Sequence, residues 1–315
     1  MRAFGKLASC VSERARTRAC CAWLLATGQG NRPRLTEWIL CGYFAYTLVL
    51  AVLLELEPAV RIQAAAASLL ALAALHYLGR FPARLVPTPL RNLLPIAGVL
   101  LAYKQMGWFA RPQESRALEE AWVRWDRMLL EDWGVGGAIE SLGPILPAFL
   151  ELLYLLTYAV GPAGLLVLLA CGRIERADRY LAFFVASAVA AYALYPYFPS
   201  EPPRTVFPGQ MFGPYETLFR ELNWWILGRG GIHTSVFPSG HVSSACGVGL
   251  GLLFALPERK IFGIAMTALA IGIAVATVYG RYHYAVDALA GLVTSGVASC
   301  ACVHAFRMRD KLRQP

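Results

Sequence analysis

Charged side chains are scarce in this chain. Only 16% of its 315 residues are Asp, Glu, Lys or Arg, whereas 57% are hydrophobic. A soluble domain normally carries about 25% charged residues, so this composition excludes an ordinary soluble protein. The hydrophobic residues come in long blocks such as 252–256 and 261–278, which lack the alternation of a transmembrane β-barrel. We therefore expect an all-α, polytopic membrane bundle.

Cysteine is absent where a disulfide scaffold or a zinc site would need it. None of the eight cysteines falls in the two long loops between the expected spans, and none forms a paired CxxC spacing. The sequence therefore excludes a disulfide framework and a cysteine-bound zinc.

Eight hydrophobic segments predict membrane-spanning helices, because each approaches the roughly 20 residues that cross a bilayer. The third segment is short, and the fourth contains Gly161-Pro162, which predicts a kink or a division into two pieces. The expected spans are 38–54, 62–78, 93–106, 145–171, 181–197, 242–256, 261–279 and 286–306.

Basic residues gather in both tails and in every second loop, whereas the first long loop between them carries six acidic residues, Asp126 among them. This alternation predicts an even number of spans with both ends cytoplasmic. The formal net charge of +9 is thus a signal of topology first and of attraction to anionic lipids second, and nucleic acid is not an expected partner. The basic residues are Arg2, Lys6, Arg14, Arg16, Arg18, Arg32, Arg34; Arg80, Arg84, Arg91; Arg173, Arg176, Arg179; Arg259, Lys260; and Arg307, Arg309, Lys311, Arg313.

These patterns divide the chain into four parts. Residues 1–35 form a basic cytoplasmic tail, 36–142 the N-terminal spans and interfacial helices, 143–306 the membrane core, and 307–315 a second basic tail. Tryptophans alternate with charges in 107–142, which is typical of amphipathic helices at the membrane interface. A loop packed over the span ends is the alternative.

Two histidines, His241 and His283, lie 42 positions apart, each at the start of an apolar run. This separation equals one crossing, a tight turn and one crossing back, so both residues are expected at the same membrane face. The charge pattern makes that face the non-cytoplasmic one and places Arg204 there as well.

His283 and Asp287 are four residues apart at the start of a helix, so their side chains share a face. A carboxylate that accepts the proton of one ring nitrogen fixes the tautomer and leaves the other nitrogen free as a nucleophile. The alternative is that His283 and Asp287 only hydrogen-bond to each other in the headgroup region and have no catalytic role.

The segment Pro238-Ser239-Gly240-His241 predicts a turn followed at once by a helix. Free backbone N–H groups at a helix start bind phosphate oxygens, and the Ser239 hydroxyl either adds to them or caps the helix. His241 would then protonate a leaving oxygen. The alternative is a capped helix with an interfacial histidine.

Two arginines are candidate phosphate ligands. Arg204 follows a proline-rich stretch that would hold its guanidinium in place, and Arg281 lies beside His283. The alternatives are a solvated loop arginine and a snorkelling interfacial one. We expect no metal at His241, His283 and Asp287, because a third strong ligand is missing, and no other cofactor.

Glu151, Tyr154 and Tyr158 lie along one face of the fourth span. A carboxylate inside a membrane is a functional candidate by default, although Glu151 could equally accept a hydrogen bond from Tyr154. His233 could touch a headgroup or be a solvated loop histidine, and His76 and His304 are expected to be structural.

The motif Pro238-Ser239-Gly240-His241 followed by His283-x-x-x-Asp287 resembles the type-2 phosphatidic acid phosphatase superfamily. The form Arg281-x-His283-Tyr284-x-x-Asp287 is similar to the branch that includes inositol phosphorylceramide synthases and inositolphosphotransferases. The resemblance covers roughly residues 145–305 and implies a six-helix core with metal-independent phosphoryl transfer.

The resemblance also implies roles for the candidate residues. His283 would attack phosphorus and form a phosphohistidine, Asp287 would orient it, and His241 would protonate the leaving group. The groups that would hold the phosphoryl oxygens are Arg204, Arg281 and the backbone of Ser239 and Gly240.

The sequence departs from the family pattern at two positions. The usual first motif has a lysine and then arginine-proline, but here the order is Pro203-Arg204 without a nearby lysine. The usual third motif has an arginine six residues before its histidine, where this chain has Thr277. Both departures favour the synthase-like branch over a plain lipid phosphatase.

The sequence thus predicts an integral membrane lipid phosphotransferase or phosphatase that acts on a phospholipid or lipid phosphate. The expected place is the plasma membrane, in bacteria the inner membrane, with the site on the non-cytoplasmic face; in a Golgi or endoplasmic-reticulum membrane that face would be lumenal. The alternative is a non-catalytic lipid-binding or transport protein with a degenerate site.

Overall fold

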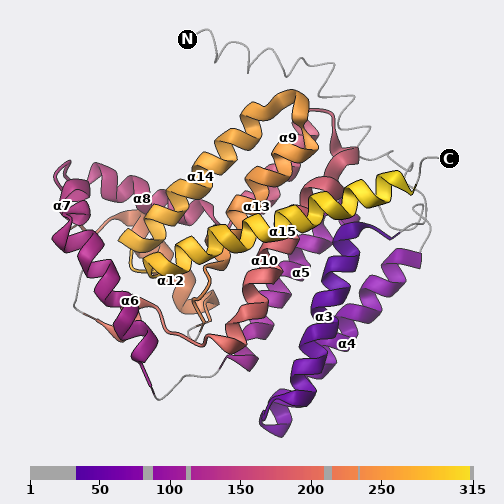
Figure 1. Cartoon of the computed structure of the whole chain (residues 1–315), viewed down its shortest axis with the longest axis horizontal. Coiled ribbons are helices and arrows are strands. Elements are labelled where there is room, and N and C mark those ends of the chain that lie inside the picture. The colour runs from indigo at the N-terminus through magenta and orange to yellow at the C-terminus, as the bar shows by residue number, and fades with distance from the viewer. Residues whose placement is uncertain (1–32, 81–87, 111–114, 209–214, 233–234, 313–315) are drawn as a thin grey trace.

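The computed structural model describes residues 33–80, 88–110, 115–208, 215–232 and 235–312. Within these ranges the chain forms helices joined by turns and contains no strand, so the prediction of an all-α membrane bundle is confirmed (Figure 1). Residues 1–32 of the N-terminal tail, Arg84, His233 and Arg313 lie outside the described residues.

The N-terminal part is a group of three helices: α3 (Leu35–Leu53), α4 (Pro58–Arg80) and α5 (Thr88–Phe109). Several of their buried polar side chains bond to one another. The Thr47 and Ser68 hydroxyls lie 3.0 Å apart, and the Gln105 amide donates to Ser68 at 2.6 Å. Such bonds join helices that meet in an apolar environment, where an unpaired polar group is costly.

The core consists of α8 (Ile145–Leu156), α9 (Val160–Ala170), α10 (Ala177–Leu194), α13 (Gly240–Ala255), α14 (Lys260–Tyr279) and α15 (Ala285–Lys311). Helices α10 and α13 approach closely because Gly247 faces α10 without a side chain. A Cβ at Gly247 would lie 2.5 Å from the Ser187 hydroxyl and 2.7 Å from the carbonyl oxygen of Phe183. Small residues at such contacts are typical of packed membrane helices.

Among the described residues, five helical segments are long and apolar enough to cross a membrane by themselves: α3, α4, α14, α15 and the segment Ile174–Tyr197 that contains α10. The pair α8 and α9 makes six if it counts as one span, and α13 is a shorter apolar helix. All eight expected segments are helical, but α5 is not among the helices that meet the span criteria. The chain is therefore a multi-pass membrane protein.

The fourth expected span is divided, as its Gly161-Pro162 pair predicts. Helices α8 and α9 are bent by 76° at a break between them. Pro162 has no N–H to bond to the carbonyl four residues earlier, and its ring clashes with that carbonyl, which favours a break in the turn before it. The Tyr180 hydroxyl of α10 enters the break and donates to the Gly161 carbonyl at 2.7 Å.

Charged helix ends gather at one end of the bundle. Glu37 at the start of α3 pairs with Arg91 of α5 at 2.7 Å, and Asp178 of α10 accepts from the Thr36 backbone and from Arg309 near the end of α15. These residues belong to the basic loops and tail that the sequence assigns to one face, so the structure places those segments at a common end.

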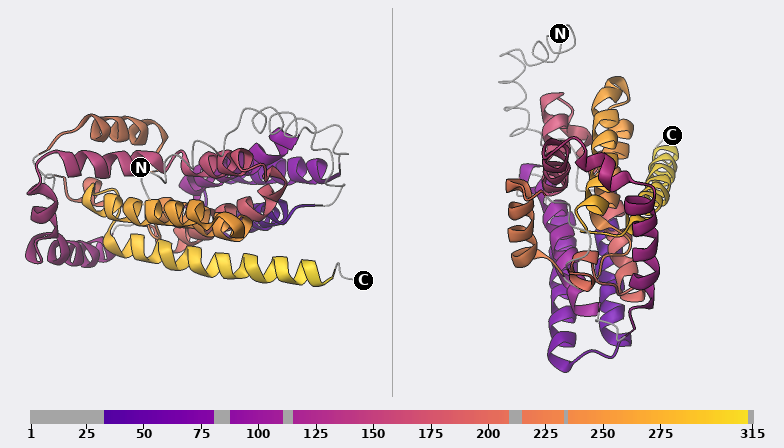
Figure 2. Two further views of the ribbon diagram at one scale, coloured as in Figure 1. Left: turned by 90° about the horizontal axis from the view of Figure 1, so that it is seen from above. Right: turned by 90° about the vertical axis from the view of Figure 1, so that its left-hand side faces the viewer.

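Shorter helices cover the opposite end: α6 (Ala117–Arg127), the π-helical η1 (Met128–Asp132), α7 (Val135–Glu140) and α12 (Leu218–Gly230). Helix α6 is amphipathic, with Trp122 buried and Trp125 exposed. The left view of Figure 2 shows α14 and α15 running side by side from the end at which α6 and α7 lie. The loop between α14 and α15 is therefore placed under these covering helices.

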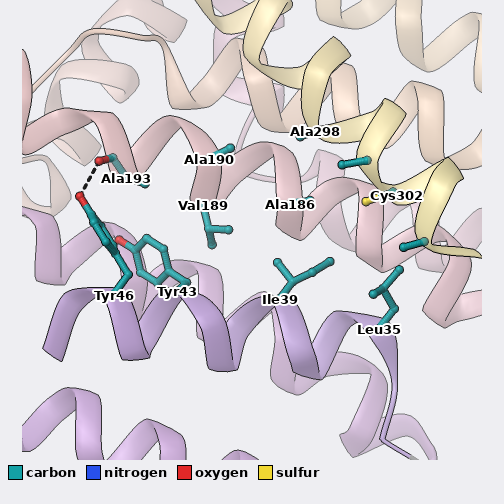
Figure 3. A pocket seen from close by; sticks show the side chains of 12 residues that line it. Leu35, Ile39, Tyr43, Tyr46, Ala186, Val189, Ala190, Ala193, Ala298 and Cys302 are labelled. Atoms are coloured by element: carbon teal, nitrogen blue, oxygen red, sulfur yellow. Dashed lines mark hydrogen bonds between the residues drawn. The ribbon is translucent and has the colours of Figure 1, made fainter. Parts of the chain in front are cut away.

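An apolar groove of about 370 Å³ runs along the side of the bundle between α3, α10 and α15 (Figure 3). Its walls are Ile39 and Tyr43 on one side, Val189 and neighbouring alanines at the base, and Cys302 opposite. The Tyr46 hydroxyl at its edge donates to the Ala193 carbonyl at 2.7 Å. Because its walls are almost entirely apolar and its helices are membrane spans, hydrocarbon rather than water suits the groove.

The close approach of α10 and α13 gives a test of the packing. We expect Gly247→Ala to destabilise the protein by about 1–3 kcal/mol, because the new methyl group overlaps a backbone carbonyl. Gly296→Ala in α15 is the matched control, since a Cβ there meets nothing within 4 Å. Thermal unfolding of the detergent-purified variants measures the stability of each. Equal unfolding midpoints for the two variants would contradict the close contact of α10 with α13 at Gly247.

Candidate active site

The site lies where the start of α13 meets the loop between α14 and α15. His241 Nδ1 and His283 Nε2 are 3.2 Å apart, although 42 positions separate them in the chain. The two loops are also joined by their backbones, because the Ser239 N–H donates to the Asp287 carbonyl at 2.9 Å. The hairpin of α13 and α14 thus brings the two histidines together, as their spacing predicts.

The neighbours of His283 define its tautomer. Its Nδ1 lies 3.0 Å from the Val236 carbonyl oxygen and 3.4 Å from Asp287 Oδ2. Both neighbours accept hydrogen bonds, so Nδ1 carries the proton and Nε2 keeps its lone pair. His241 Nδ1 is then the donor in the contact between the rings. The sequence indicated Asp287, but a backbone carbonyl such as that of Val236 leaves no signal in residue type.

The turn that carries His283 is tightly bonded to the end of α14. The N–H groups of Tyr282 and His283 both donate to the Thr277 carbonyl, at 2.9 and 3.1 Å. Arg281 takes the left-handed conformation with φ of 60°, which is uncommon for a residue with a side chain. Such conformations persist where surrounding contacts hold them, and they gather at functional sites.

Arg204 lies in the short helix α11 (Pro203–Val206), directly beside this turn. Its backbone N–H donates to the Arg281 carbonyl, and its Nη1 donates to the Tyr282 carbonyl, both at 3.3 Å. Burial, and then the positive charge of Arg204, lower the pKa of His283 to about 3. His283 is therefore neutral near pH 7, the form that a nucleophile needs.

Arg281 faces a different partner. Its side chain is 4% exposed, and its Nη1 lies 3.7 Å from Oδ2 of Asp126, which is buried on α6. Burial lowers the pKa of Arg281 and raises that of Asp126 to about 7. The sequence assigns Arg281 to phosphate binding, but gave no signal for Asp126 beyond its place among the acidic residues of a long loop.

Ser239 and Gly240 begin α13. The Ser239 hydroxyl oxygen accepts from the Val242 N–H at 3.3 Å, so this side chain caps the helix. A Cβ at Gly240 would lie 2.6 Å from the ring of Tyr192 and 2.9 Å from the Tyr195 hydroxyl. Glycine is thus required by two tyrosines at and just after the end of α10, and phosphate binding by this backbone stays a prediction.

Aromatic rings from α8 and from the break that follows it line the site beside His241. The ring centroids of Tyr154 and Tyr158 lie 5.5 and 5.9 Å from that of His241, and Tyr154 stacks on Tyr282 at 3.8 Å. Tyrosine combines an apolar ring with a polar hydroxyl, so this wall suits a ligand at the boundary between headgroup and hydrocarbon.

Glu151, one turn before Tyr154, is fully enclosed. Its carboxylate accepts from Arg220 Nε at 2.9 Å, from Asn223 Nδ2 at 2.9 Å and from the Tyr282 hydroxyl at 2.6 Å. The partners of this carboxylate come from α12 and from the His283 turn, so Glu151 joins both to α8.

Comparison with known proteins agrees with this arrangement. A family model described as the PAP2 superfamily matches residues 120–301, which include both histidines, Asp287 and Arg204. A PA-phosphatase related-family protein of Dictyostelium discoideum is 33% identical over 125 residues, which cover 36% of this chain and only 22% of that relative. No solved structure matches. Because the family model covers more than half of the sequence, the chain belongs to the PAP2 superfamily.

Proposed function

We propose that this protein is a membrane enzyme that transfers the phosphoryl group of a phospholipid or lipid phosphate through a phosphohistidine at His283. The observation that carries the proposal is the contact between His241 Nδ1 and His283 Nε2 at 3.2 Å. It leaves the unprotonated nitrogen of one ring next to the proton-bearing nitrogen of the other. Members of the PAP2 superfamily are phosphoryl-transfer enzymes, which supports this assignment.

The residues suggest a two-step reaction. In the first step Nε2 of His283 forms a bond to phosphorus while the bond from phosphorus to the leaving oxygen breaks. Burial, and then His283 and Arg204, lower the pKa of His241 to about 3 without substrate. The negative charge of a bound phosphate opposes this shift, and His241 in its imidazolium form gives its proton to the leaving oxygen. The Val236 carbonyl and Asp287 accept the Nδ1–H of the phosphohistidine, and Arg204 neutralises the charge on the phosphoryl oxygens.

The second step returns the enzyme to its starting state. An acceptor hydroxyl attacks phosphorus, the bond to Nε2 breaks, and the now neutral His241 takes the proton of the acceptor. Water as acceptor gives hydrolysis, and the hydroxyl of a second lipid gives transfer. The motif around Arg281 and His283 and the missing lysine near Arg204 favour transfer of a phospho-headgroup, as in the inositolphosphotransferase branch.

The membrane side follows from the charge pattern. The site lies at the end of the bundle opposite to the paired charged ends, exemplified by Glu37–Arg91 and Asp178–Arg309. If that charged end is cytoplasmic, the site opens on the non-cytoplasmic face, and in a bacterial inner membrane this face is periplasmic.

The products distinguish the two reactions. Purified protein is incubated with phospholipids labelled in the phosphate, and the lipids are separated by chromatography. A labelled second lipid indicates transfer, and a labelled water-soluble phosphate indicates hydrolysis. No turnover across a broad panel of phospholipids and lipid phosphates would contradict both and favour a non-catalytic lipid-binding protein.

The two histidines are expected to respond differently to the leaving group. His283→Ala should abolish activity and the trapped phosphohistidine on every substrate, because the nucleophile is gone. His241→Ala should slow the formation of the phosphohistidine by about 10²–10⁴ when the leaving group is a lipid alcohol, but far less for an aryl phosphate, whose oxygen leaves without protonation. His304→Ala, distant in α15, is the control. An equal slowing of phosphohistidine formation for both substrates in His241→Ala would exclude His241 as the proton donor.

The neutral state of His283 predicts an unusual pH profile. An imidazole with an ordinary pKa of 6.5 would lose about 30-fold of its neutral form at pH 5. Because burial lowers the pKa of His283 to about 3, this form persists as pH falls. We expect kcat/KM for a phosphodiester lipid, which does not titrate in this range, to show no such loss between pH 7.5 and 5. A decline with a midpoint near 6.5 would contradict this assignment.

A further inference from the structure

Helix α6 (Ala117–Arg127) contacts both loops that carry the histidines. The ring of Trp122 stacks on Phe237 with centroids 5.2 Å apart, and it lies 5.5 Å from the ring of Tyr284. Phe237 precedes the Pro-Ser-Gly-His segment, and Tyr284 follows His283 directly. The buried face of α6 is therefore part of the wall of the site, although no motif in the sequence marks it.

Asp126 is the polar group at the centre of this contact. Its Oδ1 accepts from the Ala285 N–H at 2.9 Å, and its Oδ2 faces Arg281 Nη1 at 3.7 Å. One fully buried carboxylate thus accepts a hydrogen bond from the residue two places after His283 and faces the guanidinium of the residue two places before it. Ala285 is the first residue of α15, where backbone N–H groups have no partner within the helix.

The same turn also positions the phosphate-facing arginine. The side chain of the left-handed Arg281 faces Asp126 at 3.7 Å, while its carbonyl accepts from the Arg204 N–H at 3.3 Å. A change in the conformation of residue 281 would therefore move both His283 and Arg204. The contact between Asp126 of α6 and Arg281 lies at this turn.

We propose that Asp126 is a positioning residue, which holds the 281–285 turn so that His283 Nε2 and the Arg204 guanidinium converge on one phosphorus atom. It acts through Arg281 and the Ala285 N–H and does not touch the substrate. This inference rests on the proposed function, in which His283 is the nucleophile.

The variants Asp126→Asn and Glu120→Gln form a matched pair on α6. Asparagine keeps an oxygen for the Ala285 N–H and removes the charge that faces Arg281, whereas Glu120 is exposed. We expect Asp126→Asn to lower kcat at least tenfold with KM changed less than threefold, and Glu120→Gln to match wild type. Asp126→Glu, which restores the charge, should recover part of kcat. Equal kcat for Asp126→Asn and wild type would overturn the proposal.

A double variant separates positioning from a general loss of folding. If Asp126 acts through Arg281, adding Asp126→Asn to Arg281→Gln should lower kcat no further than Arg281→Gln alone. If the two fold-losses in kcat multiply in the double variant, Asp126 does not act through Arg281. The thermal midpoint is measured for each variant, and a fall in kcat that only follows a fall in the folded fraction would also count against positioning.

Orthovanadate binding, followed by ⁵¹V NMR, provides a readout that needs no lipid turnover. Vanadate accepts a fifth ligand as phosphorus does during transfer, so it should bind to wild type and Glu120→Gln and at least tenfold more weakly to Asp126→Asn. This weakening in a protein that turns over no lipid would support positioning while the proposed function fails. Equal vanadate affinity in wild type and Asp126→Asn would overturn positioning even if the enzyme is active.

Discussion

The site depends on the hydrogen bond from His283 Nδ1 to the Val236 carbonyl, with Asp287 as the second acceptor. Val236 belongs to the loop before α13 and Asp287 to the first turn of α15, so this one proton joins the two motif segments. It also fixes which ring nitrogen has a lone pair. The direction of His283 and its capacity to attack phosphorus thus have the same physical origin.

Two buried ion pairs surround that bond, and each links an outer helix to the His283 turn. Arg220 of α12 pairs with Glu151, which accepts the Tyr282 hydroxyl, and Asp126 of α6 faces Arg281. A buried charge without its partner is costly, so removal of one side chain of such a pair destabilises a protein more than replacement of both. The helices that cover the site therefore also determine its geometry.

The sequence predicts features that depend on local pattern and on the length of a membrane crossing. The helical segments, the break at Gly161-Pro162 and the approach of His241 to His283 follow from such rules. The contact of Asp126 with Ala285 joins positions 159 apart through an irregular loop, for which no spacing rule exists. The Ser239 hydroxyl had two possible partners in the sequence, and only the helix start in the structure shows that it caps α13.

The direct contact between the histidine rings has an energetic consequence. At 3.2 Å the two nitrogens are too close for a phosphorus atom to lie between them, so every substrate must separate the rings and replace their hydrogen bond. A typical bond of this kind contributes about 0.5–1.5 kcal/mol net, which corresponds to as much as about tenfold in affinity. The imidazole of His241 thus competes with the phosphate for Nε2 of His283. This competition lowers the affinity for every substrate by the same factor.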